Sequence, residues 1–282
     1  LTIGVNTLPA LPKDATDRNR TSPFAFTGNK FEFRMVPSSS SIAQCNFTLN
    51  TIVAETLSEI ADRLEKASDV NAEVQTILTE IVKNHKRIIF NGNGYSDEWV
   101  VEAEKRGLLN IKSTVEATKA LIAEKNLAVM EKHGVLSRVE MESRYEIMLE
   151  NYTKAINIEA LTTLEIAKRQ ILPSVIKFAT SLAGSINTIN AAGVNADVSA
   201  QTELLTEVSS LTASLKKNIA VLEETVAKAE NFEGDAYELA AFYKFDVFEK
   251  MNAVRADADK LEVIVDADFW PLPTYGEMLF NV

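Results

Sequence analysis

The spacing of apolar residues divides the chain into a short N-terminal segment and a long helical remainder. From Phe47 to Leu64, apolar side chains recur every three or four residues, which is the spacing of an amphipathic helix. The same period predicts helices over residues 71–89, 97–105, 113–133, 137–190, 199–231 and 235–265. The predicted fold class is therefore mainly α, with long antiparallel helices in a bundle that follows a short strand and loop segment.

Residues that favour turns and caps mark the ends of these helices. Ser96 or Asp97 is expected to cap the helix that ends before Gly107. The asparagines and glycines of residues 91–94 predict a turn, because both residue types tolerate a positive φ. Pro173 is expected to bend or break the helix over residues 137–190, since proline lacks a backbone donor and clashes with the preceding turn.

The first 41 residues have a different character, with four of the seven prolines and a run of four serines, so they predict loops and short strands. The clearest strand covers residues 30–36. Its alternation places two phenylalanines on one face and three charged side chains on the other. These residues are Phe31 and Phe33 on the first face, and Lys30, Glu32 and Arg34 on the second.

A carboxylate between two cations on a fixed strand suits a site for phosphate and a divalent metal. Glu32 would offer a hard oxygen ligand to Mg²⁺, and Lys30 and Arg34 would offset the charge of a phosphoryl group. On spacing alone, an ordinary exposed strand with a salt-bridged triplet remains the better interpretation.

The C-terminal tail, residues 268–280, is aromatic and interrupted by prolines. An apolar tail of this kind is expected to dock onto the body of the protein or onto a neighbouring subunit.

Charge and composition exclude several functional classes. The formal net charge is −11, which argues against a nucleic-acid partner and against a basic helix on a membrane surface. No apolar run approaches the roughly 20 residues of a membrane span. Cys45 is the single cysteine, so no internal disulfide can form, and a reducing, cytoplasmic location is expected. His85 and His133 have no partner at metal-ligand spacing.

The amino-acid sequence of residues 17–34, here called the N-terminal strip, changes the interpretation of its charged strand. Residues 17–34 closely resemble the end of the catalytic domain of type III glutamine synthetases, and residues 19–22 and 32–34 resemble two segments of the wider family. The resemblance continues through residues 85–99, 142–146, 157–160, 167–173 and 270–275. It spans essentially the whole chain.

The resemblance implies ATP-dependent joining of ammonia to glutamate through a γ-glutamyl phosphate. It implies that Glu32 binds an active-site Mg²⁺ or Mn²⁺ ion and that Arg34 contacts the transferring phosphate and the substrate. Arg20 would face the nucleotide phosphates and glutamate, and Lys30 stands where the wider family often has an arginine near the nucleotide. A further arginine of the wider family falls here on Ala25, so that contact is absent or supplied from elsewhere.

Two parts of the family's active site do not occur in these residues, namely its Glu-X-Glu metal strand and its Asn-Gly-Ser-Gly segment. Because the chain also starts in a loop-like stretch at Leu1, we expect a piece of a longer protein that is inactive alone. Residues 1–45 would form the C-terminal end of the catalytic domain, and residues 46–282 would form a helical C-terminal region with the aromatic tail. The family implies a double-ringed homo-oligomer for the intact protein.

The rival hypothesis is a non-catalytic helical scaffold or oligomerisation module. It accounts for residues 42–265 but not for the proline-rich strip that carries Arg20, Lys30, Glu32 and Arg34.

Overall fold

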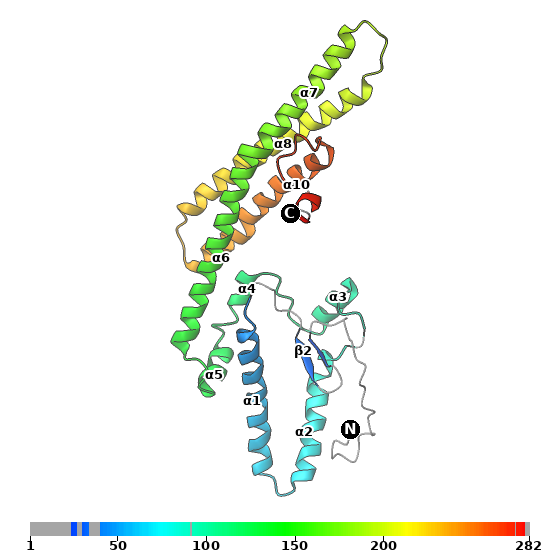
Figure 1. Ribbon diagram of the computed structural model, residues 1–282. Helices are drawn as coiled ribbons and strands as arrows, with labels where there is room; N and C mark the ends of the chain where they lie inside the picture. Colours follow the sequence, from blue (N-terminus) through cyan, green and yellow to red (C-terminus); the bar gives the residue numbers. More distant parts are fainter. Residues whose placement is uncertain (1–23, 27–29, 34–39, 91, 274, 280–282) are drawn as a thin grey trace. The chain divides into compact units, whose positions relative to one another are not determined.

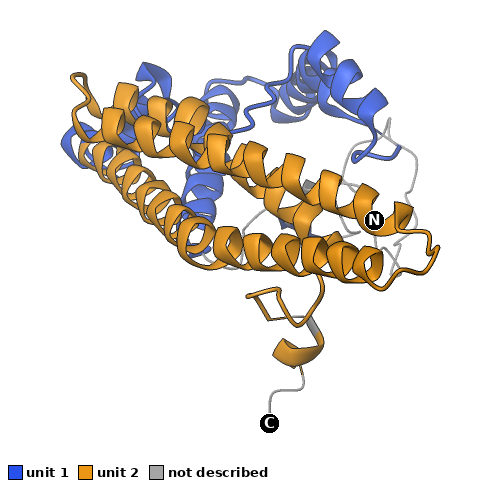
Figure 2. Ribbon diagram, turned by 90° about the horizontal axis from the view of Figure 1, so that it is seen from above, with its two compact units in different colours: residues 1–142 blue, residues 143–282 orange. Residues whose placement is uncertain are grey.

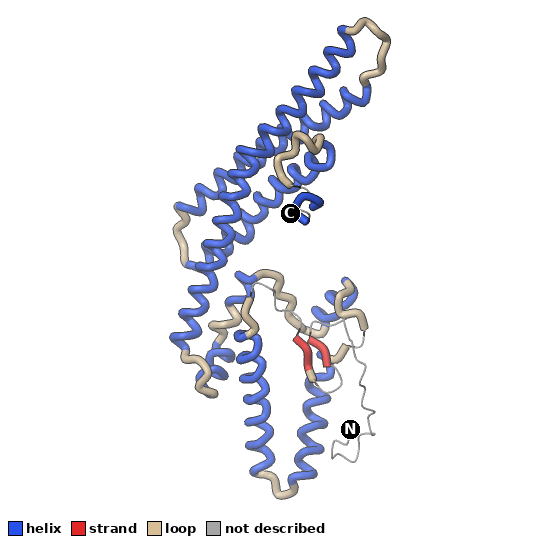
Figure 3. The backbone as a smooth tube through the Cα atoms, viewed as in Figure 1, coloured by secondary structure: helices blue, strands red, loops and turns tan. Residues whose placement is uncertain are grey.

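The structure is a computed structural model that describes residues 24–26, 30–33, 40–90, 92–273 and 275–279 (Figure 1). Helices dominate these residues, and strands occur only in one N-terminal hairpin (Figure 3). The predicted mainly α class is confirmed. The chain forms two compact units, unit 1 over residues 1–142 and unit 2 over residues 143–282 (Figure 2). The division at residue 45, which concerns membership of a catalytic domain, stays a prediction.

Unit 1 holds a two-stranded antiparallel hairpin and several helices. The strands are β1 (Phe24–Phe26) and β2 (Phe31–Phe33). The helices are α1 (Ala43–Glu65), α2 (Val70–His85), the 3₁₀ turn η1 (Lys86–Ile88), α3 (Asp97–Lys105), α4 (Thr114–Thr118), α5 (Glu124–Lys132) and the start of α6 (Arg138–Ile166).

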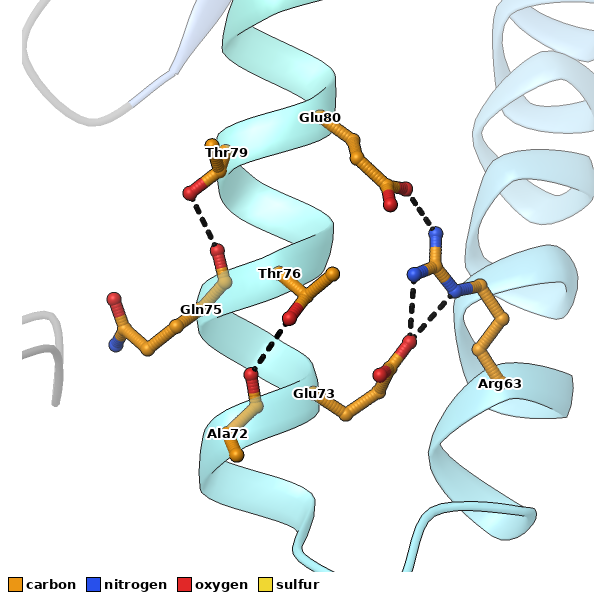
Figure 4. A network of polar contacts seen from close by, with 7 residues as sticks. All are labelled: Arg63, Ala72, Glu73, Gln75, Thr76, Thr79 and Glu80. Atoms are coloured by element: carbon orange, nitrogen blue, oxygen red, sulfur yellow. Dashed lines mark hydrogen bonds and ion pairs between the residues drawn. The ribbon is translucent and has the colours of Figure 1, made fainter.

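An ion-pair network joins α1 to α2. Arg63 on α1 donates from Nε to Glu73 at 2.8 Å and from a terminal nitrogen to Glu80 at 2.5 Å, both on α2 (Figure 4). The two carboxylates are seven positions apart, close to two helical turns, so one guanidinium reaches both. The network therefore sets the pairing of the two helices near their connecting turn.

The stretch predicted as one helix over residues 113–133 is two helices, α4 and α5. Thr118 donates from its hydroxyl to the carbonyl of Val115 at 2.7 Å. Asn126 donates from its side-chain amide to the carbonyl of Ala120 at 2.6 Å. Side chains that bond to nearby backbone carbonyls compete with the helical pattern, and the helix stops between them.

Unit 2 is an antiparallel arrangement of long helices. Helix α6 continues through a π-turn, η2 (Ala167–Ile171), into α7 (Leu172–Ala191). Helix α8 (Ser199–Glu230) returns along α7, and α9 (Ala236–Phe242), the π-turn η3 (Tyr243–Val247) and α10 (Phe248–Ile264) return along α8 (Figure 1). The short helix α11 (Tyr275–Leu279) follows.

Pro173 does not break the long helix, which was one of the two outcomes expected. It occupies the first turn of α7, directly after η2. A π-turn holds one extra residue, which relieves the clash between the proline ring and the preceding carbonyl. The helix therefore continues from Arg138 to Ala191 with a local change of winding.

The core of unit 2 follows the helical period of α8. Leu215, Ile219 and Leu222 have no exposed surface, and they pack with residues of α6, α7 and α10. The tail docks onto this core, as the sequence predicted: Phe269, Trp270 and Leu272 pack against it, and the ring of Phe269 lies 5.7 Å from that of Phe178.

Candidate functional site

The β-hairpin carries the two described members of the predicted site. Lys30 and Glu32 are two positions apart, so the alternation of an extended chain places them on one face. The Nζ atom of Lys30 lies 3.8 Å from Oε1 of Glu32. The Lys30 side chain is 67% exposed and that of Glu32 is 38% exposed. The structure thus brings the carboxylate and one cation together, with the carboxylate still accessible to a ligand.

The phenylalanines beside Glu32 are largely exposed. Phe31 is 65% exposed and Phe33 is 41% exposed. Two strands of three residues provide too little surface to bury an aromatic side chain unless a further layer covers them.

Arg20 and Arg34 lie outside the described residues, so their place relative to Glu32 stays a prediction. The register of the hairpin pairs residue 25 with Glu32 across the two strands. Position 25, where the wider family would place an arginine, is therefore the backbone neighbour of the predicted metal ligand.

Glu32 fits a divalent metal as a single ligand. A carboxylate is a ligand type that Mg²⁺ and Mn²⁺ accept, but these ions require several oxygens. Within the described ranges of the chain, no three His, Cys, Asp or Glu side chains gather closely enough to hold an ion. Further ligands would have to come from outside these ranges.

A second cluster of interacting side chains lies on α3 and the segments that flank it, and it was not predicted from the sequence. The rings of Phe90 and Trp99 stack with centroids 3.9 Å apart and planes at 18°. The guanidinium of Arg106 lies 5.9 Å from the Phe90 centroid and 5.4 Å from the Trp99 centroid. We call these three residues the aromatic clasp.

Hydrogen bonds hold the arginine of the aromatic clasp in place. Arg106 donates to Glu102 at 2.6 Å and to the backbone carbonyl of Ile89 at 3.0 Å. Arg87 donates in turn to the carbonyl of Arg106 at 3.0 Å. Charge-assisted hydrogen bonds therefore fix the position of Arg106, the residue that contacts both stacked rings.

Gly92 explains why the turn at residues 91–94 contains glycine. A β-carbon at Gly92 would lie 2.7 Å from the Phe90 ring, so any other residue at this position would require that ring to shift. Among the described residues, positive φ occurs at Gly107, Gly134 and Gly193. The available signals were Phe90, two positions before Gly92, and Trp99, seven positions after it.

His133 has a structural partner. Its Nε2 atom lies 2.7 Å from Oε2 of Glu55, and Lys132 lies 2.8 Å from the same carboxylate. Hydrogen bonds from Lys132, and then from His133, hold the pKa of Glu55 below its ordinary value of 4.5. These contacts join α1 to the end of α5.

Comparisons with known proteins show a similarity to glutamine synthetases. A family model described as "Glutamine synthetase C-terminal domain" matches residues 73–190. The chain is 40% identical over 99% of its length to a type-3 glutamine synthetase of Dictyostelium discoideum. Along nearly its whole length, the chain is therefore similar to glutamine synthetases. It is also 36% identical over 96% of its length to a glutamine synthetase of Butyrivibrio fibrisolvens.

The similarity to individual glutamine synthetases includes the N-terminal strip as well as the helices, whereas the family model matches residues 73–190 only. A glutamine synthetase of Bacteroides fragilis is 31% identical and matches 100% of the chain. The chain spans about two fifths of the length of these glutamine synthetases, 39% of the first two and 40% of the third. None of the helices in the described part of the chain is both long enough and apolar enough to cross a membrane.

Proposed function

We propose that this chain is part of a glutamine synthetase that joins ammonia to glutamate at the expense of ATP. In that reaction the γ-carboxylate of glutamate attacks the γ-phosphorus of ATP and ADP leaves. Ammonia then attacks the acyl carbon of the γ-glutamyl phosphate, and inorganic phosphate leaves. The observation that carries the proposal is identity of 31–40% to three glutamine synthetases along nearly the whole chain.

Residues of the N-terminal strip would form one wall of the active site. Glu32 would hold Mg²⁺ or Mn²⁺, which supplies positive charge next to the transferring phosphate when bound. Arg34 would bind the transferring phosphate and the substrate, and Arg20 the nucleotide phosphates and glutamate. Lys30 lies 3.8 Å from Glu32 and would contact the nucleotide.

The exposed charges of Lys30 and Glu32 support this assignment. A carboxylate that is 38% exposed can exchange its interaction with Lys30 for a metal ion without leaving a buried charge unpaired. The helical scaffold hypothesis accounts less well for the findings, because the similarity to glutamine synthetases extends through this strip.

The isolated chain would be inactive, since one carboxylate cannot complete a site for Mg²⁺. We further propose that the intact protein acts in the cytoplasm and assembles into a double-ringed homo-oligomer. Glutamate, ammonia and ATP would be its substrates, with no nucleic-acid or membrane partner.

The test uses the full-length polypeptide with Glu32→Gln, which keeps the shape of the side chain and removes its charge. We expect glutamine formation to fall by about 10- to 100-fold or more, because loss of even an outer-sphere partner of a metal ligand has an effect of that size. The Mg²⁺ concentration that gives half-maximal activity should rise.

Glu150→Gln provides the control. Glu150 pairs with Lys154 at 2.9 Å on the surface of α6, so the variant removes one carboxylate away from the strip. Equal activity of Glu32→Gln and Glu150→Gln would contradict the assignment of Glu32. Glutamine formation by the isolated chain would contradict the proposal that the chain supplies only one wall.

A further inference from the structure

The ion pair between Lys30 and Glu32 is long and exposed. The Nζ atom of Lys30 lies 3.8 Å from Oε1 of Glu32, and the two side chains are 67% and 38% exposed. An N–H···O hydrogen bond is about 2.7–3.2 Å long, so these two atoms attract one another by charge without a direct hydrogen bond. An exposed ion pair of this kind shifts an equilibrium by about fivefold at most. A stronger ligand for either side chain can therefore separate the two.

The backbone keeps both side chains on one short stretch of the chain. Lys30 directly precedes β2 and Glu32 is the middle residue of that strand, so alternation places both on one face. Positions two apart on an extended chain are roughly 6–7 Å from one another along the strand. Lysine carries its ammonium group on a flexible four-carbon stem. An ammonium group that leaves Glu32 thus stays within reach of a ligand bound there.

The two side chains suit two parts of one bound substrate. A carboxylate oxygen is a ligand type for Mg²⁺ or Mn²⁺, and an ammonium group donates hydrogen bonds to phosphate oxygens. In phosphoryl transfer, a divalent cation and a lysine commonly hold oxygens of the same nucleotide phosphates. A divalent cation on Glu32 would also repel Lys30, which lies 3.8 Å from that carboxylate. Binding of the cation therefore releases Lys30 beside the phosphates that the cation attracts.

We propose that Lys30 couples metal binding to nucleotide binding by exchanging Glu32 for a nucleotide phosphate. The inference rests on the proposed function, because it takes Glu32 as a ligand of the divalent cation. Either ligand must separate Lys30 from Glu32 when it binds first, and the second ligand then finds them already separated. Each ligand therefore raises the affinity for the other, by about fivefold at most from this pair.

A double-variant cycle in the full-length polypeptide tests the exchange. ADP binding is measured by calorimetry in EDTA, so that no divalent cation contributes. Glu32→Gln releases Lys30 and should tighten ADP binding by about two- to fivefold. In the Lys30→Gln background the same substitution should have no effect, because no ammonium group remains to be released. A general loss of negative charge would instead tighten ADP binding equally in both backgrounds.

Mn²⁺ binding in the absence of nucleotide provides the second measurement. Electron paramagnetic resonance of free Mn²⁺ gives the affinity of the full-length protein for the ion. Lys30→Gln should tighten Mn²⁺ binding by about two- to fivefold, because the ion no longer competes with an ammonium group, and it should weaken ADP binding. Lys30→Arg keeps the charge and should restore both affinities toward those of the natural protein. A substitution that merely disturbed the strand would weaken both ligands.

The pair of Lys154 and Glu150 on α6 is the matched control. Its atoms lie 2.9 Å apart, and the side chains are 69% and 59% exposed. Lys154→Gln and Glu150→Gln make the same changes of charge as the variants of the strip. Neither should change the affinity for ADP or for Mn²⁺.

The outcomes separate the exchange from the proposed function. Equal effects of Glu32→Gln in the two backgrounds overturn the exchange, as does Mn²⁺ binding that Lys30→Gln leaves unchanged or weakens. If Glu32→Gln weakens Mn²⁺ binding while the cycle shows no coupling, the assignment of Glu32 stands and the exchange alone fails. If Glu32→Gln leaves Mn²⁺ binding unchanged, the assignment of Glu32 fails and the exchange with it. Coupling in a full-length protein that forms no glutamine overturns the proposed function alone.

Discussion

At the scale of single residues, the interior of unit 2 contains one polar pair whose geometry allows a quantitative test. Asn218 on α8 donates from Nδ2 to Oδ2 of Asp257 on α10 at 2.8 Å, and Asp257 is only 7% exposed. Asn218→Leu removes the donor and leaves a buried carboxylate without this partner. We expect the free energy of unfolding to fall by about 1–3 kcal/mol, measured by urea denaturation.

The double variant Asn218→Leu/Asp257→Leu is the control for this pair. Replacing both partners by apolar groups removes the unsatisfied carboxylate, so stability should return toward that of the natural protein. If the double variant is less stable than Asn218→Leu, the pair contributes net stability and the penalty for a lone buried carboxylate is not the cause.

At the scale of elements, Glu55 makes the contact between α1 and α5 sensitive to acid. Its pKa in the folded protein lies below the ordinary value of 4.5, because Lys132 and then His133 donate hydrogen bonds to the carboxylate. A lowered pKa means that its contribution to stability is complete above about pH 4.5. That contribution is lost as the pH falls through the folded value. We expect the protection of the α1 and α5 amides, taken relative to their intrinsic exchange rates at each pH, to fall below pH 4.5.

Glu55→Gln should remove this part of the pH dependence. Its α1 and α5 amides should exchange faster near neutral pH than those of the natural protein, and the difference should narrow as acid protonates Glu55. Glu150→Gln, which loses an ion pair within a single helix, is the matched control and should leave exchange over α1 and α5 unchanged. A difference that stays constant down to pH 3 would show that another group carries the acid response.

Helix ends were predictable where one local side chain decides them. Ser96 accepts from the backbone of Trp99, and Asp235 forms a capping box with Glu238, so these helices begin where the sequence indicated. Gly107 adopts the positive φ expected of a helix stop. Such signals depend on residues within one turn, which sequence alone contains.

The two π-turns show where local prediction stops. Pro173 marked a disturbance but not its form, because either a break or an extra residue in the winding relieves the same clash. At η3, Tyr243 is buried and donates from its hydroxyl to Asn157 on α6 at 3.1 Å. Asn157 is 86 positions away. A contact at that separation depends on how helices pack, and no pattern within residues 243–247 records it.

The candidate site was predictable for a different reason. Glu32 and Lys30 share a face because strands alternate, and the structure bears out that pairing. Their spacing could not distinguish a catalytic wall from an ordinary surface, and the catalytic wall, which the resemblance to the family favours, stays a prediction. The exposure of Phe31 and Phe33 was missed because alternation predicts which side chains share a face, whereas burial depends on what lies over that face.

At the scale of the whole molecule, the two units differ in what holds them together. Unit 2 has a continuous core along α8, whereas the small core cluster of unit 1 consists of Leu127, Met130 and Met141 with partly buried neighbours. The ion pairs of Arg63 and Glu55 join the helices of unit 1 at exposed or half-exposed positions. Surface pairs contribute little to stability, so unit 2 should resist unfolding more strongly than unit 1.

Leu215→Ala tests whether the core along α8 carries that resistance. Leu215 has no exposed surface, so truncation leaves a cavity and should lower the free energy of unfolding of unit 2 by about 2–5 kcal/mol. Urea denaturation, with hydrogen exchange of α8 as the local probe, measures the loss. Leu161→Ala is the matched control, because Leu161 on α6 is 46% exposed and its truncation creates no enclosed cavity. Equal losses for the two variants would contradict a core centred on α8.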